Sequence, residues 1–206
     1  MSIIYTIGYS AFKIDGFIEV LKRYGIQCII DVRSVPYSKN YACYNREVLK
    51  ETLKIAGIRY RNYADEFGAR QTDKCFFSKE GYLDFKKYTK SDKFNKGYEQ
   101  ICKGIEMGYT FALMCAEVDP IDCHRNIMIA REFSERGFEI KNIMKSGGTQ
   151  SQTEIEKRLL NKYFGERNQV SLFGDMVEEA ELINNAYNLK NKEIGYRLDG
   201  REESYG

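Results

Sequence analysis

Short apolar runs alternate with helical patterns along most of the chain. Apolar runs of strand length occupy residues 2–7, 26–32, 58–63, 111–115 and 138–144. Between them, apolar residues recur at three- and four-residue intervals, as in helices that bury one face. This alternation predicts a doubly wound, mostly parallel α/β sheet of about five strands with helices on both faces.

Polar residues and glycines delimit the first two predicted helices. Asp15 and Asn45 are the expected N-caps, because short polar side chains accept the free N–H groups of a first helical turn. Gly25 and Gly57 are the expected ends, where a left-handed residue commonly stops a helix.

The sheet pattern ends near residue 150. The spacing Thr153-x-x-Glu156 is that of a capping box and predicts a helix through residue 164. A last helix is expected to carry Ile183 and Tyr187 on its apolar face. We therefore expect residues 1–150 to form the α/β domain. Residues 151–206 should form a helical C-terminal extension that packs on it and is frayed from about residue 191.

Charge and cysteine content narrow the functional class only a little. The net charge is +2, with 32 basic and 30 acidic residues, so electrostatics neither requires nor excludes a polyanionic partner. The six cysteines have no spacing of a secreted disulfide scaffold, no signal peptide opens the chain, and no apolar run reaches the length of a membrane span. We expect a cytoplasmic protein without a membrane partner.

Polar side chains gather where the predicted strands end. They are Tyr9 and Ser10, Asp31 and Arg33, and Glu117, with Cys123, His124 and Arg125 a few positions further on. The carboxyl ends of parallel strands share one edge of a sheet, where sites commonly form. His124 is the single histidine of the chain, so any imidazole chemistry takes place there. The structural alternative is an ion-pair network that joins the loops.

These residues predict acid–base catalysis on an anionic substrate. The expected catalytic residues are Asp31, Glu117, Cys123 and His124. Neighbouring residues of a helix diverge by about 100°, which makes a Cys123–His124 dyad awkward. His124 or Glu117 is therefore the expected general acid or base, with Asp31 orienting a water or the substrate. The expected anion and substrate ligands are Tyr9, Ser10, Arg33, Arg125, Ser146 and Gly147.

Three motifs resemble one protein family. They are Thr6-Ile-Gly-Tyr-Ser10, Asp31-Val-Arg-Ser-Val-Pro36, and Met114-Cys-Ala-Glu117 followed by Cys123-His-Arg125. In order and spacing they are similar to the family called domain of unknown function 488. The resemblance covers residues 1 to about 145 and implies a Rossmann-like fold with these residues as a shared site, but no reaction. The polar segment 71–78 and the C-terminal extension depart from the family pattern, so substrate or partner is expected to be particular to a subgroup.

Two other chemistries fit the sequence less well. Residues 29–33 are also similar to a strand of the rhodanese family, but Ala-Glu-Val-Asp-Pro follows Cys115 where rhodaneses have an anion-binding loop. A zinc site of Cys115, Cys123 and His124 lacks a paired Cys-x-x-Cys spacing, and neighbouring Cys and His side chains rarely both reach one ion. We therefore expect no metal and no cofactor.

The extension holds a candidate docking peptide. Gln169-Val-Ser-Leu-Phe173 resembles the peptide by which bacterial replication and repair proteins dock on the sliding clamp, with Leu172 and Phe173 in apolar pockets and Gln169 held by hydrogen bonds. The alternative is that Leu172 and Phe173 pin the extension to the domain. Docking would place basic and aromatic residues near DNA phosphates and bases, namely Lys39, Arg46, Arg59, Arg61, Arg70, Tyr37, Tyr41, Tyr44 and Tyr60.

The sequence thus predicts an enzyme that acts on a nucleotide or nucleic acid by hydrolysis or glycosyl-type transfer, in DNA repair or defence. The alternative is a non-catalytic nucleic-acid- or partner-binding module, in which the same strand-end residues form a structural network.

Overall fold

The computed structural model describes residues 2–165 and 179–198. Among these residues, six strands form one sheet in the order β3-β2-β4-β1-β5-β6. The strands are β1 (Ile3–Gly8), β2 (Cys28–Asp31), β3 (Arg59–Asn62), β4 (Phe111–Cys115), β5 (Glu139–Ile143) and β6 (Thr149–Ser151). The first five are parallel, and β6 is antiparallel to β5. The predicted doubly wound α/β fold of Rossmann-like type is confirmed, and a hairpin adds a sixth strand to the five expected.

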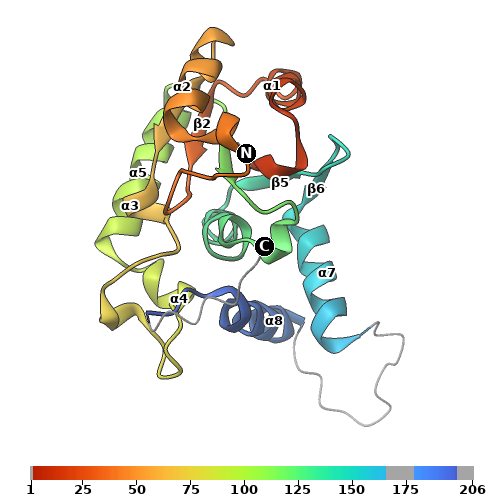
Figure 1. The fold of residues 1–206 in the computed structure, drawn as a ribbon. Coiled ribbons are helices and arrows are strands. Elements are labelled where there is room, and N and C mark those ends of the chain that lie inside the picture. Colours follow the sequence, from red (N-terminus) through yellow and green to blue (C-terminus); the bar gives the residue numbers. More distant parts are fainter. Residues whose placement is uncertain (1, 166–178, 199–206) are drawn as a thin grey trace.

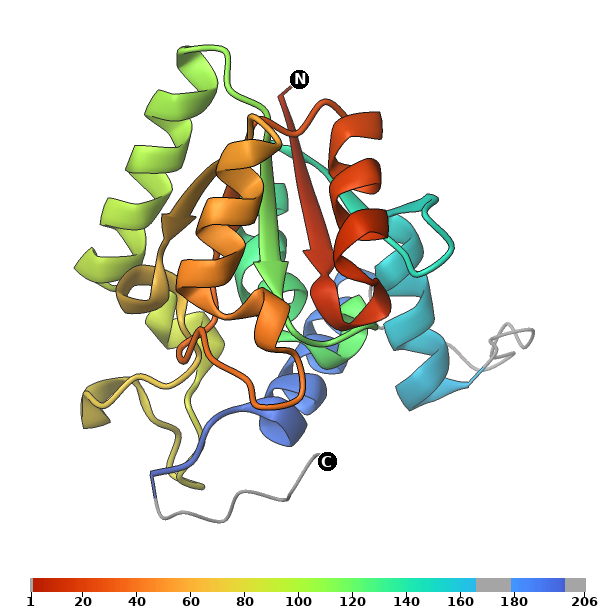
Figure 2. The ribbon, with the colours of Figure 1, turned by 45° about the horizontal axis from the view of Figure 1, so that its top comes forward.

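Helices cover both faces of the sheet (Figures 1 and 2). One face carries α1 (Ile14–Arg23) and α2 (Arg46–Ile55). The other carries α5 (Asp92–Glu106), a π-helix (Arg125–Ala130) that continues as α6 (Arg131–Glu135), and α7 (Gln152–Phe164). The remaining helices are α3 (Ala64–Phe67), α4 (Phe85–Tyr88) and α8 (Glu179–Ile194), with 3-10 turns at Tyr9–Ala11, Ala42–Tyr44, Lys74–Phe76 and Pro120–Asp122.

Two apolar layers arise because successive side chains of a strand point to opposite faces. In β1, Ile4 packs on the α5 side and Ile7 on the α1 and α2 side. Leu113 and Met114 divide β4 in the same way. All four side chains are fully buried, and each such burial stabilises the fold by about 1.5–3 kcal/mol. The apolar runs of the sequence are therefore strands buried on both faces, as parallel sheets require.

The predicted C-terminal glycines of the first two helices are confirmed, whereas the predicted N-caps are only partly so. Gly25 and Gly57 end α1 and α2 with φ of 62° and 79°, a conformation that favours glycine. Asp15 was expected as an N-cap but lies inside the first turn of α1, where its charge complements the helix dipole. Asn45 does occupy the N-cap of α2. However, its Oδ1 accepts from Ser38 N (2.7 Å) and fixes the preceding loop instead of the helix.

The capping box of α7 lies two residues earlier than predicted. Ser151 Oγ accepts from Glu154 N, and the Glu154 carboxylate accepts from Ser151 N (2.7 Å). The prediction that Thr153 and Glu156 form the capping box was wrong. Ser151 and Glu154 have the same three-residue spacing, so the sequence motif alone does not distinguish the two pairs. Glu156 instead accepts from the Tyr187 hydroxyl (3.2 Å).

A buried polar network ties the C-terminal helices to the sheet. Asn126 Nδ2 donates to Asn142 Oδ1 (2.8 Å) and to Gln152 Oε1 (3.0 Å). Thr6 Oγ1 donates to the same Asn142 oxygen (2.8 Å), and Gln152 Nε2 donates to Tyr187 Oη (2.7 Å). These contacts join β1, β5, the π-helix, α7 and α8. Such a network favours one packing arrangement because each member left unpaired in the core would destabilise the fold.

The C-terminal helices also share the apolar core of the sheet. Ile155 and Leu159 of α7, with Ala186 and Tyr187 of α8, belong to the same buried cluster as Ile4 of β1. The expected boundary at residue 150 falls inside β6.

The chain remains packed beyond α8. Asn191 Nδ2 donates to Leu83 O (2.8 Å), and Asn191 Oδ1 accepts from Phe85 N (2.9 Å). Leu83 N donates to Tyr196 O (2.8 Å). The expectation of fraying from about residue 191 is therefore wrong for residues 191–196, because α8 continues to Ile194 and both Asn191 and Tyr196 are bonded to the segment that leads into α4. Within the described segments, no helix has the length and apolar character needed to cross a membrane.

Asn191→Ala tests this attachment. The substitution leaves two buried backbone groups unpaired, each at a cost of about 1–3 kcal/mol, so the free energy of unfolding should fall by about 2–4 kcal/mol in urea denaturation. Asn188→Ala, at an exposed position of the same helix whose side chain makes no hydrogen bond within the described ranges, is the matched control, with an expected change within about 0.5 kcal/mol. Equal effects of the two substitutions would contradict the attachment.

Candidate functional site

The loops after β1, β2 and β4 meet at one edge of the sheet. In Figure 2 the arrows of β1 and β4 point to this edge, where the loop after β2 and the turn at Pro120–Asp122 also lie. Ser10 N and Oγ both donate to Ala116 O (3.2 and 2.5 Å). His124 Nε2 lies 3.0 Å from Val32 O. Segments far apart in sequence thus converge, as expected for the carboxyl ends of parallel strands.

Four reactive side chains form a cluster at this edge, which we call the strand-end cluster: Cys115, Glu117, Cys123 and His124. Their side-chain donor atoms all lie within 4.8 Å of one another. Cys123 Sγ donates to Glu117 Oε2 (2.7 Å), and His124 Nδ1 lies 3.8 Å from Cys115 Sγ. Both cysteines and the histidine are buried, whereas Glu117 is exposed. The cluster therefore has one side that faces solvent.

The local backbone explains how two sequence neighbours reach the same cluster. Cys123 is extended (φ −131°, ψ 134°) and separates the 3-10 turn from the π-helix. Its carbonyl oxygen accepts from Asn126 N (3.0 Å) and Ile127 N (3.1 Å), so the helix begins directly after it. The prediction that Cys123 and His124 diverge by a helical angle was wrong, because Cys123 lies outside the helix. A π-helix is uncommon and often accompanies functional sites.

Opposite electrostatic effects act on Cys123 and His124. Burial alone would raise the pKa of the Cys123 thiol, but the hydrogen bond from Cys115 and the positive charges of Arg125 and His124 lower that pKa well below its usual value. Burial alone would lower the pKa of His124. The bond and charge of Cys123, with the charge of Glu117, raise it instead.

Burial also perturbs the other two members of the strand-end cluster. Although the residue as a whole is exposed, the Glu117 carboxyl group is turned onto Cys123. Its partial enclosure and the negative charge of Cys123 raise the pKa of Glu117 to about 7. Full burial raises the pKa of the Cys115 thiol well above its usual value, and the neighbouring charge at Cys123 adds to this effect. Groups perturbed in this way are typical of functional sites.

Asp31 and Arg33 form a separate ion pair beneath the loop after β2. Asp31 is fully buried and accepts from Arg33 Nε (2.9 Å), Arg33 Nη2 (2.6 Å), Arg33 N (3.1 Å) and the Tyr60 hydroxyl (2.6 Å). A carboxylate has about four acceptor positions, so these four hydrogen bonds use all of the acceptor positions of Asp31. Arg33 Nη2 also donates to Tyr44 O (2.9 Å). The geometry favours the structural alternative for this pair, which joins β2, β3 and the turn before α2.

Arg125 holds the loop that follows β4. Its side chain is fully buried, with Nη1 donating to Glu117 O (2.6 Å) and Nη2 donating to Val118 O (3.3 Å). The Arg125 backbone N–H points at Cys123 Sγ (3.4 Å). Arg125 and Ser10 together therefore bind the backbone carbonyl groups of residues 116–118. The buried Arg125 Nε has no hydrogen-bond partner in the part of the chain that the structure describes, so the predicted binding of a substrate anion by Arg125 would have to use Nε or replace the bonds to these carbonyl groups.

The other predicted ligands lie outside the strand-end cluster. Tyr9 is buried and stacks on Tyr44 with ring centres 4.4 Å apart. Ser146 and Gly147 form the turn between β5 and β6, where Gly147 O accepts from the Tyr24 hydroxyl of the α1 end (2.8 Å). Gln169, Leu172 and Phe173 of the candidate docking peptide lie outside the described residues.

Two residues that the sequence analysis did not assign to the site are part of it. Cys115 lies two positions before Glu117 in an extended segment, and this spacing of two was the available signal, because it places both side chains on one side. Gly8 ends β1 so close to the next loop that an added Cβ would lie 1.9 Å from Glu117 O. The sequence holds no signal for this approach, since it depends on β1 and β4 being neighbours.

Exposed apolar side chains occur in the loops that follow β2 and β4, next to the strand-end cluster in the chain, and we call them the rim. They are Val35 (53% exposed), Tyr37 (62%), Tyr41 (40%) and Val118 (39%). The first three belong to the loop after β2, whose Val32 carbonyl contacts His124, and Val118 follows Glu117. Tyr41 also packs edge-on against Tyr9 with ring centres 5.6 Å apart. The rim thus contains two exposed aromatic side chains, Tyr37 and Tyr41.

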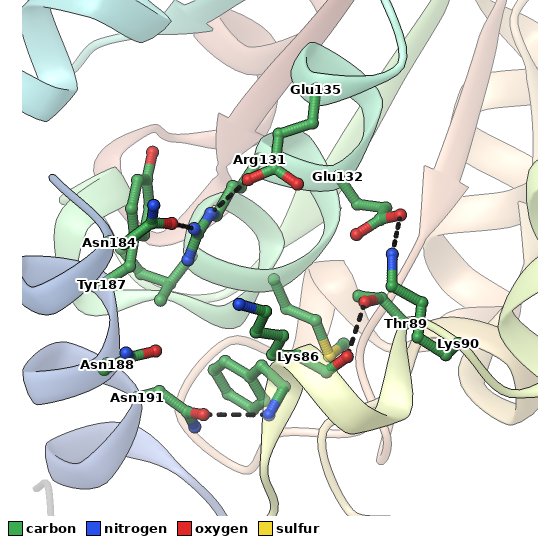
Figure 3. A pocket seen from close by; sticks show the side chains of 13 residues that line it. Lys86, Thr89, Lys90, Arg131, Glu132, Glu135, Asn184, Tyr187, Asn188 and Asn191 are labelled. Carbon is green, nitrogen blue, oxygen red and sulfur yellow. Dashed lines mark hydrogen bonds and ion pairs between the residues drawn. The ribbon is translucent and has the colours of Figure 1, made fainter. Parts of the chain in front are cut away.

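A polar hollow of about 280 Å³ lies elsewhere, between α4, the π-helix with α6, and α8 (Figure 3). Four of its five charged side chains are paired, because Lys90 binds Glu132 (3.0 Å) and Arg131 binds Glu135 (2.8 Å) and Asn184, and the fifth is Lys86. No member of the strand-end cluster lines this hollow. We therefore place the candidate site at the strand ends.

Comparison with known proteins gives one match. The family model described as Domain of unknown function DUF488 matches residues 13–131. That range contains the motif at residues 31–36 and all four residues of the strand-end cluster. The motif at residues 6–10 lies before it. Neither a curated protein nor a solved structure matches the chain.

Gly8→Ala tests the close approach of β1 to the loop after β4. Gly8 has φ −97°, which suits any residue, so the effect should be purely steric. Because the new Cβ would displace the Glu117 carbonyl, the free energy of unfolding should fall by about 1–3 kcal/mol in urea denaturation. Gly16→Ala in α1 meets no atom within 4 Å and should raise it by about 0.5–1 kcal/mol. If Gly8→Ala left the free energy of unfolding unchanged, the close contact between residue 8 and Glu117 O would be ruled out.

Proposed function

The chain belongs to the DUF488 family, whose description names no reaction, and on this premise we propose that it is an enzyme whose site is the strand-end cluster. The proposed reaction is hydrolysis or glycosyl-type transfer on a nucleotide or nucleic acid. In this proposal Glu117 is the general acid or base, and the buried Cys115, Cys123 and His124 form the floor of the site.

One observation carries the proposal, namely the position of the Glu117 carboxyl group. It lies between the buried thiol of Cys123, 2.7 Å away, and the solvent on the open side of the cluster. A general acid or base must come within hydrogen-bond reach of its substrate while remaining fixed by the protein. Arg125 and Gly8 provide this fixation, because they hold the Glu117 backbone at its carbonyl group.

The rim supports a base or a nucleic acid as the ligand. Tyr37 and Tyr41 are exposed beside the cluster, and exposed aromatic rings stack on nucleobases without regard to sequence. Lys39 and Arg46 flank the same loop and supply positive charge for phosphates. Tyr44 and Tyr60 do not contribute to this surface, because Tyr44 is buried and the Tyr60 hydroxyl is bound to Asp31.

A non-catalytic binding module is the second candidate. It is favoured by the number of strand-end groups that are engaged within the protein, above all Asp31, Arg33 and Arg125. Such a module would bind nucleic acid through the rim and would lose no function when Glu117 is replaced. Action in DNA repair or defence, and docking on a sliding clamp through Gln169, Leu172 and Phe173, are further parts of the proposal that depend on the sequence alone.

The cysteines support a reducing compartment such as the cytoplasm. All six are free, including the exposed Cys75, and none of them is bonded to another cysteine. Free thiols of this kind persist where glutathione and thioredoxin keep them reduced.

Replacing the catalytic carboxylate tests the enzyme directly. Wild type and Glu117→Gln would be incubated with nucleosides, nucleotides and short single-stranded DNA and RNA, and the products separated chromatographically. A turnover lowered about 100-fold or more is expected for Glu117→Gln, because the amide cannot transfer a proton. Glu106→Gln, at the end of α5 before β4, is the control and should retain wild-type turnover. Release of base, sugar or phosphate at equal rates by both variants would remove Glu117 from the mechanism.

Replacing the rim tyrosines tests the ligand class. Tyr37→Ala combined with Tyr41→Ala should weaken binding of a short single-stranded oligonucleotide about 10-fold or more, since each lost stacking contact contributes about 1–3 kcal/mol. Met107→Ala removes an apolar side chain that is even more exposed (73%), at the opposite edge of the sheet, and should have no effect. Fluorescence anisotropy of a labelled oligonucleotide gives the dissociation constants. Equal affinities of all three proteins would argue against nucleic acid at the rim.

A further inference from the structure

The strand-end cluster has the donor set of a zinc site. It combines two thiols, one imidazole and one carboxylate. In the described part of the chain, no other three or more Cys, His, Asp or Glu side chains converge in this way. Zn²⁺ prefers sulfur and nitrogen ligands with four-fold coordination, and soft thiolates select zinc against magnesium or calcium.

The distances agree with tetrahedral coordination. With Zn–S near 2.3 Å and Zn–N near 2.1 Å, two ligand atoms of a tetrahedral site lie about 3.5–3.8 Å apart. Cys115 Sγ and His124 Nδ1 are separated by 3.8 Å. Cys123 Sγ and Glu117 Oε2, at 2.7 Å, are closer than two ligands would be. That pair would separate on metal binding, and Glu117 has room to do so because it lies on the exposed side.

The surroundings of His124 orient it as a metal ligand. Val32 O is a carbonyl oxygen and can only accept, so His124 Nε2 must carry the hydrogen that bridges their 3.0 Å separation. The lone pair of a neutral imidazole then lies on Nδ1, which faces the two thiols. A ligating histidine characteristically donates its other N–H to a carbonyl or carboxylate in this manner.

The backbone conformation lets neighbouring ligands converge. Cys123 is extended, whereas His124 has helical angles (φ −59°, ψ −25°), so the two side chains do not diverge as they would within a helix. The sequence-based objection to zinc assumed that neighbouring Cys and His side chains rarely both reach one ion. In this structure Cys123 and His124 both belong to one group with Cys115.

Charge also balances within the site. Two thiolates and the Glu117 carboxylate carry three negative charges, which match one Zn²⁺ ion together with the fully buried cation of Arg125. Without a cation, two thiolates and a carboxylate within 4.8 Å of one another would repel each other. Coordination requires deprotonated thiols, and the displaced protons pass to the solvent.

We propose that Cys115, Cys123 and His124 bind one Zn²⁺ ion, and that Glu117 closes the fourth position on the solvent side. Three buried ligands with one exchangeable position are the arrangement of catalytic rather than purely structural zinc. Zinc binding itself stands on the donor geometry. Displacement of Glu117 from the fourth position by a nucleotide or nucleic acid, which would free its carboxylate for the acid–base role, rests on the proposed function.

Zinc titration of the reduced, full-length protein after chelator treatment tests the site. One Zn²⁺ per chain is expected by isothermal titration calorimetry. Cys123→Ser should weaken binding about 100-fold or more, beyond the roughly 10–100-fold typical of losing an outer-shell partner. Cys102→Ser on α5 removes a thiol outside the cluster and should bind as wild type does. Stoichiometry near zero for wild type, or unchanged affinity of Cys123→Ser, would overturn the proposal.

A cobalt titration identifies the ligands independently of affinity. Co²⁺ in the wild type should show the visible bands of a tetrahedral ion with thiolate-to-cobalt charge transfer, and this absorption should be halved or lost in Cys115→Ser. Because Glu117 is exposed, Glu117→Gln should fold normally and keep the thiolate absorption while binding about 10-fold more weakly. An octahedral spectrum without thiolate absorption would contradict the site even if every cysteine variant misfolded.

The two proposals fail in different ways. Zinc bound with thiolate absorption but no turnover of any nucleotide or oligonucleotide would leave the metal site standing and remove the enzyme. Turnover that depends on Glu117 in a protein that binds no zinc would overturn the metal site alone.

Discussion

The buried guanidinium group of Arg125 is the contact on which the site depends. By donating to the carbonyl groups of Glu117 and Val118, it fixes the loop after β4 against the end of β1. A buried guanidinium without acceptors would destabilise the fold strongly, so loop and cation hold each other in place. The same loop can approach β1 only because residue 8 is glycine. The position of Glu117 is thus set by packing that is independent of any ligand.

From this fixed loop, the remaining features of the site follow. Cys115 ends β4, the 3-10 turn at Pro120–Asp122 returns the chain, and an extended Cys123 brings its thiol back beside Glu117. The π-helix then directs His124 towards the end of β2. The result is a cluster in which Cys115, Cys123 and His124 are buried and Glu117 is exposed, with the exposed Tyr37 and Tyr41 in the loop after β2. Such preorganisation is what acid–base and metal-assisted chemistry require.

The fold and the meeting of the strand-end side chains at one edge could be predicted from the sequence, because both depend on strand–helix alternation and on the parallel direction of the strands. The convergence of Glu117, Cys123 and His124 was expected in this way. Their mutual geometry was not, because the sequence analysis placed Cys123 in a regular helix, whereas its backbone is extended. The engagement of Asp31 was foreseen only as the alternative of an ion-pair network, and its fourth donor, the Tyr60 hydroxyl of the neighbouring strand β3, was not foreseen. Contacts of this kind depend on strand order, which the sequence pattern leaves open.

X-ray absorption at the zinc edge of the zinc-loaded protein tests the convergence of these side chains most directly. Two sulfur ligands near 2.3 Å and one or two nitrogen or oxygen ligands near 2.0–2.1 Å are expected, in a four-coordinate shell. A shell of nitrogen and oxygen alone would mean that Cys115 and Cys123 do not bind the ion together. The strand-end cluster would then be no metal centre, whatever the affinity of the protein for zinc.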